Sequence, residues 1–423
     1  MTVCKERDPW SSTIVPGGKY YITRNASTIV AFAVGQKWKP GNAIAMVGAH
    51  TDSCCLRLKP VSKRQSDGFL QVGVETYGGG MWHTWFDRDL GIAGRVMVKR
   101  PDGGMEQKLV HIDRPICRVP NLAVHFGGSV PFEFNKEAQL YPIAGLVEAE
   151  LNRQGKTAED AKKEKEESAE EDGEFNPLKS PLQRHHPYIV EIVADDAGVK
   201  PEEVLDFELV LYDVQKSTLG GLNNELIFSA RLDNLEMTYC AVEGLIKSTS
   251  PDGKPLTDET TIRMIACFDH EEIGSTSAQG ADSNIMPSIL HRLCALPFAH
   301  EAAESDKSYD RADHSTSKDS DTSTAYEQSL ASSFLISADM AHSVNPNYSA
   351  KYEAEHKPLM NKGTVIKINA NVRYATSTPG IVLLQEIAKR AKKSSADSRR
   401  SGTGVPLQMF VVRNDSPCGS TIG

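Results

Sequence analysis

Three apolar segments that each end abruptly in polar residues most constrain how this chain folds. They are Ala43–Val47, Ile262–Phe268 and Phe334–Ile336. Such segments are typical of buried strands, and in α/β proteins ligands gather beyond the carboxyl ends of the strands. Apolar residues recur at helical spacing at Leu235, Tyr239, Val242, Leu245 and Ile246. The sequence therefore predicts an α/β fold with a mixed central sheet and helices on both of its faces.

The sequence pattern changes from about Arg57 to Gln215, where short segments of alternating apolar and polar residues, such as Leu70–Thr76, are separated by many glycine turns. We interpret residues 57–215 as an inserted, mainly β domain, which leaves residues 1–56 and 216–423 as a discontinuous second domain. The polar stretches predict a solvated helix or surface loop over 152–173 and a disordered loop over 301–323. Residues 389–404 predict a helix end followed by a loop.

Composition excludes several classes of function. The net charge is −9 and no long basic stripe is present, which argues against nucleic acid or an anionic membrane as the main partner. No apolar segment is long enough to span a membrane, and the amino terminus lacks a signal sequence, so we expect a cytoplasmic protein. The 8 cysteines are scattered without a metal-binding spacing and are expected to be reduced thiols.

Polar residues with metal-ligand chemistry follow the apolar segments. Glu271 and Glu272 follow the second segment, where one carboxylate can bind a metal while its neighbour acts as a base. His50 and Asp52 follow the first segment, so Asp52 can orient the imidazole from one ring nitrogen. Asp233 and Asp339 are the remaining candidates, and helix capping is the alternative role of each. Together with His50, these acids supply the ligand types of a two-zinc hydrolase, except that one histidine ligand is missing.

Several sequence blocks resemble the aspartyl aminopeptidase family of co-catalytic zinc exopeptidases, over nearly the whole chain. The matching blocks are Lys19–Asn25, Gly48–Asp52, Val74–Gly80, Trp85–Leu90, Ser229–Asn234, Asp269–Ser275, Ser337–His342, Gly363–Thr376 and Val412–Thr421. The resemblance implies a zinc-exopeptidase catalytic domain with an inserted domain used for oligomerisation.

The resemblance also assigns roles to the metal-site candidates. It implies that His50 and Asp339 serve two different zinc ions together with Glu272, and that Asp233 bridges the pair. It also implies that the Asp233–Asn234 peptide is cis, a geometry that would aim the bridging carboxylate. It makes Glu271 the general base and Asp52 the residue that orients His50. The same ligand types also accept manganese or cobalt, so the identity of the metal stays open.

A further set of residues matches the family's substrate-binding positions: His125, Glu271, Asp339, His342, Lys367 and Tyr374. Lys367 would meet the acidic side chain of an N-terminal Asp or Glu, although a solvated lysine at a strand edge is the alternative. His125 would enter the active site of a neighbouring subunit, or else be a half-buried strand histidine. His342 and Tyr374 have a helix-surface position and a core or rim position as their alternatives.

Relatives of this family continue beyond the block that ends at Gly423 into a segment with the last zinc-binding histidine, and they begin earlier than this chain. We therefore expect one incomplete zinc shell in this sequence, as a fragment or a degenerate paralogue would have. The expected function is removal of acidic N-terminal residues from peptides by a homo-oligomer, dodecameric by resemblance. The alternatives are a non-catalytic assembly subunit, a different peptide selectivity, and a vacuolar location.

Overall fold

The computed structural model describes residues 1–126, 133–157, 178–251, 253–296, 322–370, 374–396 and 407–411. Its contacts divide the chain into two compact units, residues 1–335 and 336–423, and each is described by itself. The predicted stretches 152–173 and 301–323 lie largely outside the described residues. In the stretch 389–404, residues 389–396 form the end of the helix Thr378–Ala396, as predicted, and 397–404 lie outside the described residues. The family-like block from Val412 to Thr421 lies wholly outside them.

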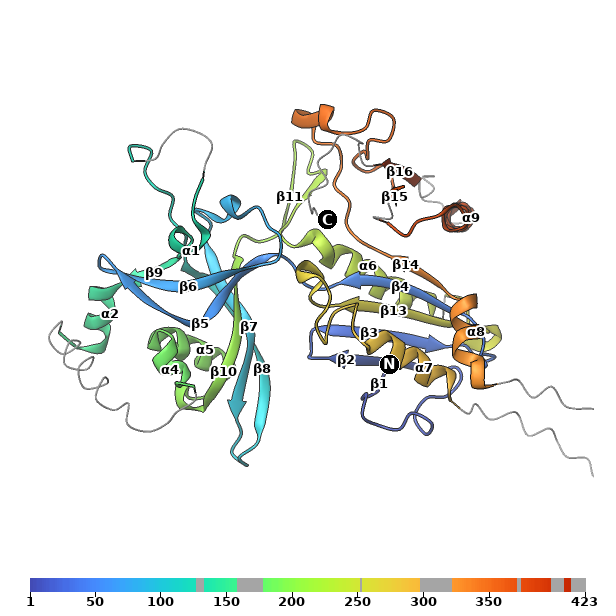
Figure 1. Cartoon of the computed structure of the whole chain (residues 1–423), viewed down its shortest axis with the longest axis horizontal. Helices are drawn as coiled ribbons and strands as arrows, with labels where there is room; N and C mark the ends of the chain where they lie inside the picture. The colour runs from blue at the N-terminus through green and yellow to red at the C-terminus, as the bar shows by residue number, and fades with distance from the viewer. Residues whose placement is uncertain are drawn as a thin grey trace, which may run out of the picture. The chain divides into compact units, whose positions relative to one another are not determined.

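A six-stranded mixed sheet is formed by strands from residues 2–50 and 262–337 (Figure 1). Its strands, in the order β1-β2-β3-β13-β4-β14, are Thr2–Val3, Lys19–Arg24, Thr28–Val34, Ile262–Phe268, Ile44–His50 and Phe334–Ser337. β13 runs antiparallel to β3 and parallel to β4. The predicted mixed sheet is confirmed. We call it the first sheet.

Alternating side chains on these strands bury both faces of the first sheet, as period-2 geometry requires. One face holds Phe32 and Met264 and is covered by α7 (Ile285–Cys294), whose Ile289 is fully buried. The other face holds Ile265 and packs against α6 (Leu232–Ser248). Helices therefore cover both faces of the sheet, as predicted, and α8 (Ala325–Ser332) also packs against α7.

A second, all-antiparallel sheet lies between β4 and β13 in the sequence. In the order β8-β7-β10-β5-β6-β9, its strands are Met105–Cys117, Leu90–Lys99, Val204–Asp213, Cys55–Ser66, Phe69–Tyr77 and Ile143–Leu146. Its associated helices are α1 (Lys136–Gln139), α2 (Val147–Gln154), α4 (Pro181–Arg184) and α5 (Pro187–Ala197). The core includes Leu56, Val96 and Leu209 with Val190 and Val193 of α5. The predicted domain boundaries at 57 and 215 stay a prediction.

The remaining elements are short or belong to unit 2. A hairpin of β11 (Thr218–Gly220) and β12 (Leu226–Phe228) precedes α6. Unit 2 contains α9 (Thr378–Ala396) and two parallel strands, β15 (Thr364–Ile368) and β16 (Leu407–Val411). The 3-10 helices are Trp82–Trp85, Pro201–Glu203, Leu256–Asp258, Glu271–Ile273, Thr322–Thr324 and Pro346–Lys351. Within the described residues, none of the helices combines the length and the apolar character needed to cross a membrane.

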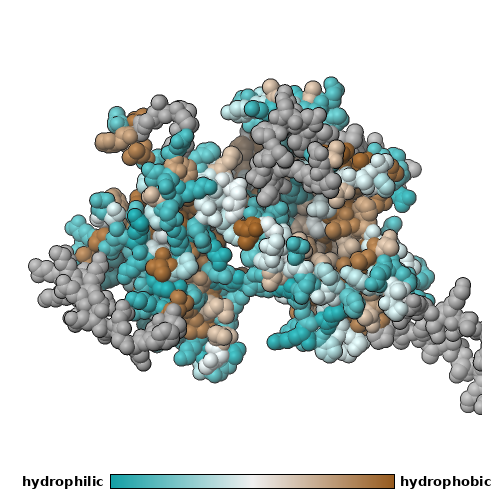
Figure 2. Space-filling model, in the orientation of Figure 1, coloured by the Kyte–Doolittle hydropathy of each residue, from teal (hydrophilic) through white to brown (hydrophobic). Residues whose placement is uncertain are grey.

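One prediction about burial is wrong. β14 forms where predicted, but Leu335 is 56% exposed, because β14 is the last strand of the sheet order and has a single neighbour among the described strands. The helix predicted from the apolar spacing forms as α6, on which Leu235 and Tyr239 are exposed while Ala241 and Leu245 pack against the sheet. Figure 2 shows hydrophobic surface over α6 and β14.

Candidate metal centre and active site

The register of β4 and β13 places two groups of candidate residues at one edge of the first sheet. The strands are parallel neighbours in which Phe268 lies beside His50, so both chains leave the sheet at the same level. The backbone N–H of Thr51 donates to the Phe268 carbonyl, 2.7 Å away, and joins the two strand ends. Because parallel strands end together, His50 and the Glu271–Glu272 turn converge despite their separation in sequence.

Asp52 is the centre of the hydrogen-bond network at this edge, and its side chain is 6% exposed. Its carboxylate accepts from the Tyr77 hydroxyl at 2.8 Å and from the backbone N–H groups of Glu271 and Glu272 at 3.1 and 3.0 Å. Burial acts to raise the pKa of Asp52, but the hydrogen bonds from His50, Tyr77 and the two amides together hold it below its usual range. Asp52 is therefore a buried carboxylate anion that fixes the glutamate turn. We call Asp52, His50, Tyr77, Glu271 and Glu272 the Asp52 cluster.

The His50 imidazole is oriented from one side and presents its other nitrogen to a carboxylate. Nδ1 lies 3.1 Å from the Asp52 carbonyl oxygen and 3.4 Å from the Asp52 carboxylate. These acceptors favour the tautomer with the proton on Nδ1, which leaves the Nε2 lone pair available to a metal. Nε2 lies 3.3 Å from Asp233 Oδ1 and 3.9 Å from Glu271 Oε2.

Asp233 reaches the same point from the start of α6. The Asp233–Asn234 peptide is cis, which confirms the prediction from the resemblance. The Ser53 hydroxyl donates to the Asp233 carbonyl at 2.7 Å. The Asp233 side chain does not cap α6, so the helix-capping alternative is wrong. Its buried Oδ1 accepts no hydrogen bond from the described residues, which is the condition of a carboxylate oxygen placed for a cation.

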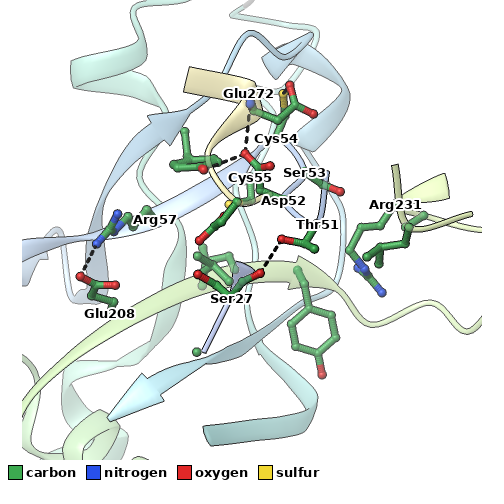
Figure 3. A pocket seen from close by; sticks show the side chains of 18 of the residues that line it. Ser27, Thr51, Asp52, Ser53, Cys54, Cys55, Arg57, Glu208, Arg231 and Glu272 are labelled. Atoms are coloured by element: carbon green, nitrogen blue, oxygen red, sulfur yellow. Dashed lines mark hydrogen bonds and ion pairs between the residues drawn. The ribbon is translucent and has the colours of Figure 1, made fainter. Parts of the chain in front are cut away.

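Glu271 and Glu272 lie in a single turn of 3-10 helix that follows His270, whose φ of 66° turns the chain away from the strand. Burial raises the pKa of Glu272, and its carboxylate Oε2 accepts from the Cys54 thiol at 3.0 Å. Burial, and next the bond to Glu272, raise the pKa of the Cys54 thiol to about 12. Figure 3 shows Cys54 and Glu272 side by side above Asp52.

The donor atoms of this edge fit a zinc ion. One ligand atom from each of His50, Glu271 and Glu272 lies within 4.8 Å of the others. Imidazole nitrogen and carboxylate oxygen are ordinary zinc ligands, and the His50 side chain is already oriented by an outer hydrogen bond. A cavity of about 650 Å³ in unit 1 is lined by Asp52, Asp233 and Glu272, and gives small molecules access to the site.

The other predicted site residues of the catalytic domain lie in unit 2. Lys367, on β15, donates to the Asp339 carboxylate at 2.8 Å, and its ammonium lies 5.8 Å from the centre of the Tyr374 ring. Both charged side chains are largely shielded from solvent, at 19% and 23% exposure, so Lys367 is not the solvated lysine of the alternative. His342 lies outside any helix, with its ring 5.6 Å from that of Tyr352. Unit 2 thus brings Asp339, Lys367 and Tyr374 together.

His125 lies in an exposed turn of the segment between β8 and α1. Its neighbours Val124 and Phe126 are 81% and 80% exposed. The alternative of a half-buried strand histidine is therefore wrong. Its predicted role at a neighbouring subunit stays a prediction.

Sequence patterns alone do not predict the roles of two residues of the site. Tyr77 lies in the family-like block Val74–Gly80, and a tyrosine just before a run of glycines at a strand end is a detectable signal. Cys54 is one of the scattered cysteines. Its contact with Glu272 joins positions 218 apart, and no pattern in the sequence marks it.

Comparisons with known proteins agree with this geometry. The profile of the family described as "Aminopeptidase I zinc metalloprotease (M18)" matches residues 1–423. The chain is 60% identical to an aspartyl aminopeptidase of Aspergillus oryzae over 99% of this chain and 80% of that protein. It is 49% identical to aspartyl aminopeptidase 4 of Saccharomyces cerevisiae, over 99% of this chain and 78% of the relative.

Solved structures show the same fold. The cryo-EM structure of the Ape4 and Nbr1 complex matches with a TM-score of 0.81 at 45% identity, and covers 100% of this chain and 70% of that chain. The S. cerevisiae mApe1 dodecamer matches with a TM-score of 0.72 at 28% identity, over 97% and 78% of the two chains. The family profile and the identities lead to one conclusion: this chain belongs to the M18 family of zinc aminopeptidases.

Proposed function

We propose that this protein is an aspartyl aminopeptidase that hydrolyses the first peptide bond of substrates with an N-terminal Asp or Glu, with two zinc ions at its active site. The observation that carries the proposal is the convergence of His50, Asp233, Glu271 and Glu272 at the carboxyl ends of β4 and β13. Relatives named aspartyl aminopeptidase, at 60% and 49% identity, support the choice of substrate.

In this proposal His50, Asp233, Glu272 and Asp339 would hold the zinc ions. Zinc supplies a Lewis acid that polarises the scissile carbonyl and makes water a stronger nucleophile near neutral pH. Asp52 holds the His50 ring, and its bonds to two backbone amides fix the direction of the Glu271–Glu272 turn.

Glu271 acts as the general base and then as the general acid. It takes a proton from the attacking water and returns it to the leaving amine, so the peptide bond breaks without release of an amide anion. Its side chain is 34% exposed, more open than that of Asp52, and its Oε2 lies 3.9 Å from the His50 ring nitrogen. This openness is what a group that must meet both water and substrate requires.

Lys367 provides the selectivity for an acidic side chain, with Tyr374 beside it. Lys367 is half-buried and already binds one carboxylate, that of Asp339, so its charge can also attract a carboxylate of the substrate. Asp339 and His342 would hold the substrate's amino-terminal residue. We further propose that the protein assembles as a homo-dodecamer, as the mApe1 structure is described, and that His125 enters the site of an adjacent subunit.

Substitution of the base tests the mechanism. Glu271→Gln keeps the size of the side chain but removes its ability to take a proton, so kcat is expected to fall by roughly 10²–10⁴-fold. Zinc content, measured by elemental analysis on the same sample, should stay at the wild-type value. Hydrolysis of an Asp-peptide by the Gln variant at the wild-type rate would remove Glu271 from the mechanism.

A substrate panel tests the selectivity. Peptides that differ only in an N-terminal Asp, Glu, Leu or Lys are compared on wild type and Lys367→Ala. Loss of one charged hydrogen bond, worth about 1.5–3 kcal/mol, should lower kcat/KM for Asp and Glu by roughly 10–100-fold and leave Leu nearly unchanged. A wild-type preference for Leu would overturn the acidic assignment. A metal-poor, inert wild type would favour a non-catalytic assembly role.

A further inference from the structure

We propose that Cys54 is a positioning residue for the metal site: its thiol binds one oxygen of Glu272 and thereby directs the other oxygen toward zinc. The inference rests on the proposed role of Glu272 as a zinc ligand. The direct observation is the 3.0 Å contact in which Cys54 Sγ donates to Glu272 Oε2. Figure 3 shows the sulfur adjacent to the Glu272 side chain.

The position of the thiol is fixed from the second sheet. Gly78 follows β6 with a φ of +83°, and a Cβ added there would lie 2.8 Å from Cys54 Sγ and 3.0 Å from Glu272 Cβ. Glycine at position 78 therefore lets the backbone approach both side chains closely, and this contact limits where the thiol can lie.

This arrangement gives Glu272 two independent supports. Its backbone N–H donates to Asp52 at 3.0 Å, which fixes the main chain, and Cys54 fixes the end of the side chain. A carboxylate held at one oxygen loses less rotational freedom when a metal binds the other, so an outer partner of this kind raises metal affinity. The chemistry needs only a donor of suitable length, which a serine hydroxyl also supplies.

The neighbouring cysteine is a matched control. Cys55 begins β5 and is also partly buried beside the site. Among the hydrogen bonds of the described residues, none joins Cys55 to Glu272, whereas Cys54 makes one. A substitution of Cys55 thus tests the loss of a thiol near the site without the loss of the Glu272 contact.

The test is zinc affinity of the full chain, measured by competition with a chelator for the metal alone. Cys54→Ala and Cys54→Val both remove the donor, and valine retains much of the volume if alanine impairs folding. We expect the zinc dissociation constant to rise about 10-fold in both, and to stay within about threefold of wild type in Cys54→Ser and Cys55→Ala. Wild-type affinity in the two donor-free variants, or equal losses in the serine variant, would overturn the proposal.

A double-mutant cycle with Glu272→Ala checks that Cys54 acts through Glu272, since replacement of Cys54 should then add no further loss of zinc affinity. An additive loss overturns the assignment. Hydrolysis of an Asp-peptide by wild type, measured in parallel, separates the two levels. If wild type does not hydrolyse the peptide but the Cys54 variants still lose zinc affinity, only the proposed function is contradicted. If wild type hydrolyses the peptide but the Cys54 variants bind zinc as wild type does, only the role of Cys54 is contradicted.

Discussion

Two buried polar clusters of unit 1 differ in their arrangement: among the described residues, one gathers potential metal-ligand atoms and the other does not. In the Asp52 cluster, the contacts of Asp52 hold the His50 ring and the Glu271–Glu272 turn, whose ligand atoms lie within 4.8 Å of one another. In the second sheet, His185 is 1% exposed and bonds to the Ser62 hydroxyl, 2.8 Å from its Nδ1. The adjacent Arg184 binds Asp206 and two backbone carbonyls. We call Ser62, Arg184, His185 and Asp206 the His185 cluster.

The two clusters differ in whether potential metal-ligand atoms gather around their histidine. Burial lowers the pKa of His185 to about 4, so this ring is perturbed as strongly as many catalytic groups. Yet the described residues bring no set of ligand atoms together around His185, whereas they do so around His50. A shifted pKa marks burial, whereas ligand atoms of several residues gathered within 4.8 Å of one another mark a candidate site.

The largest expected effect comes from removal of the Asp52 carboxylate. Asp52→Ala releases both the His50 ring and the glutamate turn, so zinc affinity should fall about 100-fold. Competition with a chelator measures the zinc dissociation constant. Asp258→Ala, which removes an exposed partner of Lys37, is the control and should bind zinc as wild type does. Equal affinity in Asp52→Ala and wild type would erase the distinction between the two clusters.

Acid should destabilise the protein through the His185 cluster. The folded-state pKa near 4 lies below the ordinary value of 6.5, so between these pH values the unfolded chain binds a proton that the folded chain does not. This contribution to stability is nearly complete above about pH 6.5 and is lost as the pH falls toward 4, by about 3 kcal/mol.

Denaturant unfolding of the metal-free chain across this pH range measures the loss. His185→Gln should flatten the profile over this window. If the substitution leaves the slope unchanged, His185 is not the group that titrates. Zinc affinity at neutral pH should be the same in His185→Gln and wild type, because the His185 cluster does not contribute to the metal site.

The smallest expected effect is that of Tyr77→Phe. It removes one of several donors to Asp52 and retains the ring, so a loss of roughly 1 kcal/mol, or about fivefold in zinc affinity, is expected. Tyr141→Phe, in the loop between α1 and β9, is the control, because its hydroxyl bonds only to Glu137 among the described residues. A loss as large as that of Asp52→Ala would mean that the Tyr77 hydroxyl, rather than the backbone amides, holds Asp52 in place.

The sequence predicted the elements that have strong local patterns. The strand Ile262–Phe268 has the predicted bounds, and Glu271 and Glu272 follow it as expected. The first strand extends three residues beyond Val47 to His50, because pairing with β13 continues to Phe268. The cis peptide at Asp233 came from the family resemblance, since no local pattern encodes it.

Other features depend on contacts between distant parts of the chain. The contacts of Tyr77 with Asp52 and of Cys54 with Glu272 form only when the chain around the second sheet packs against the edge of the first sheet. Likewise, the apolar pattern of Phe334–Ile336 predicts a strand but not its place at the end of the sheet, which leaves it exposed. Periodicity shows which residues share a face, whereas topology decides what covers that face.

The most direct test of the metal site is a zinc titration of the metal-free chain, wild type beside Asp233→Ala. We expect tight binding by wild type and a large loss of affinity in the variant, because Asp233 places a buried oxygen 3.3 Å from the His50 ring nitrogen. If wild type and Asp233→Ala bind zinc with the same affinity and stoichiometry, the edge formed by β4 and β13 is not the metal site.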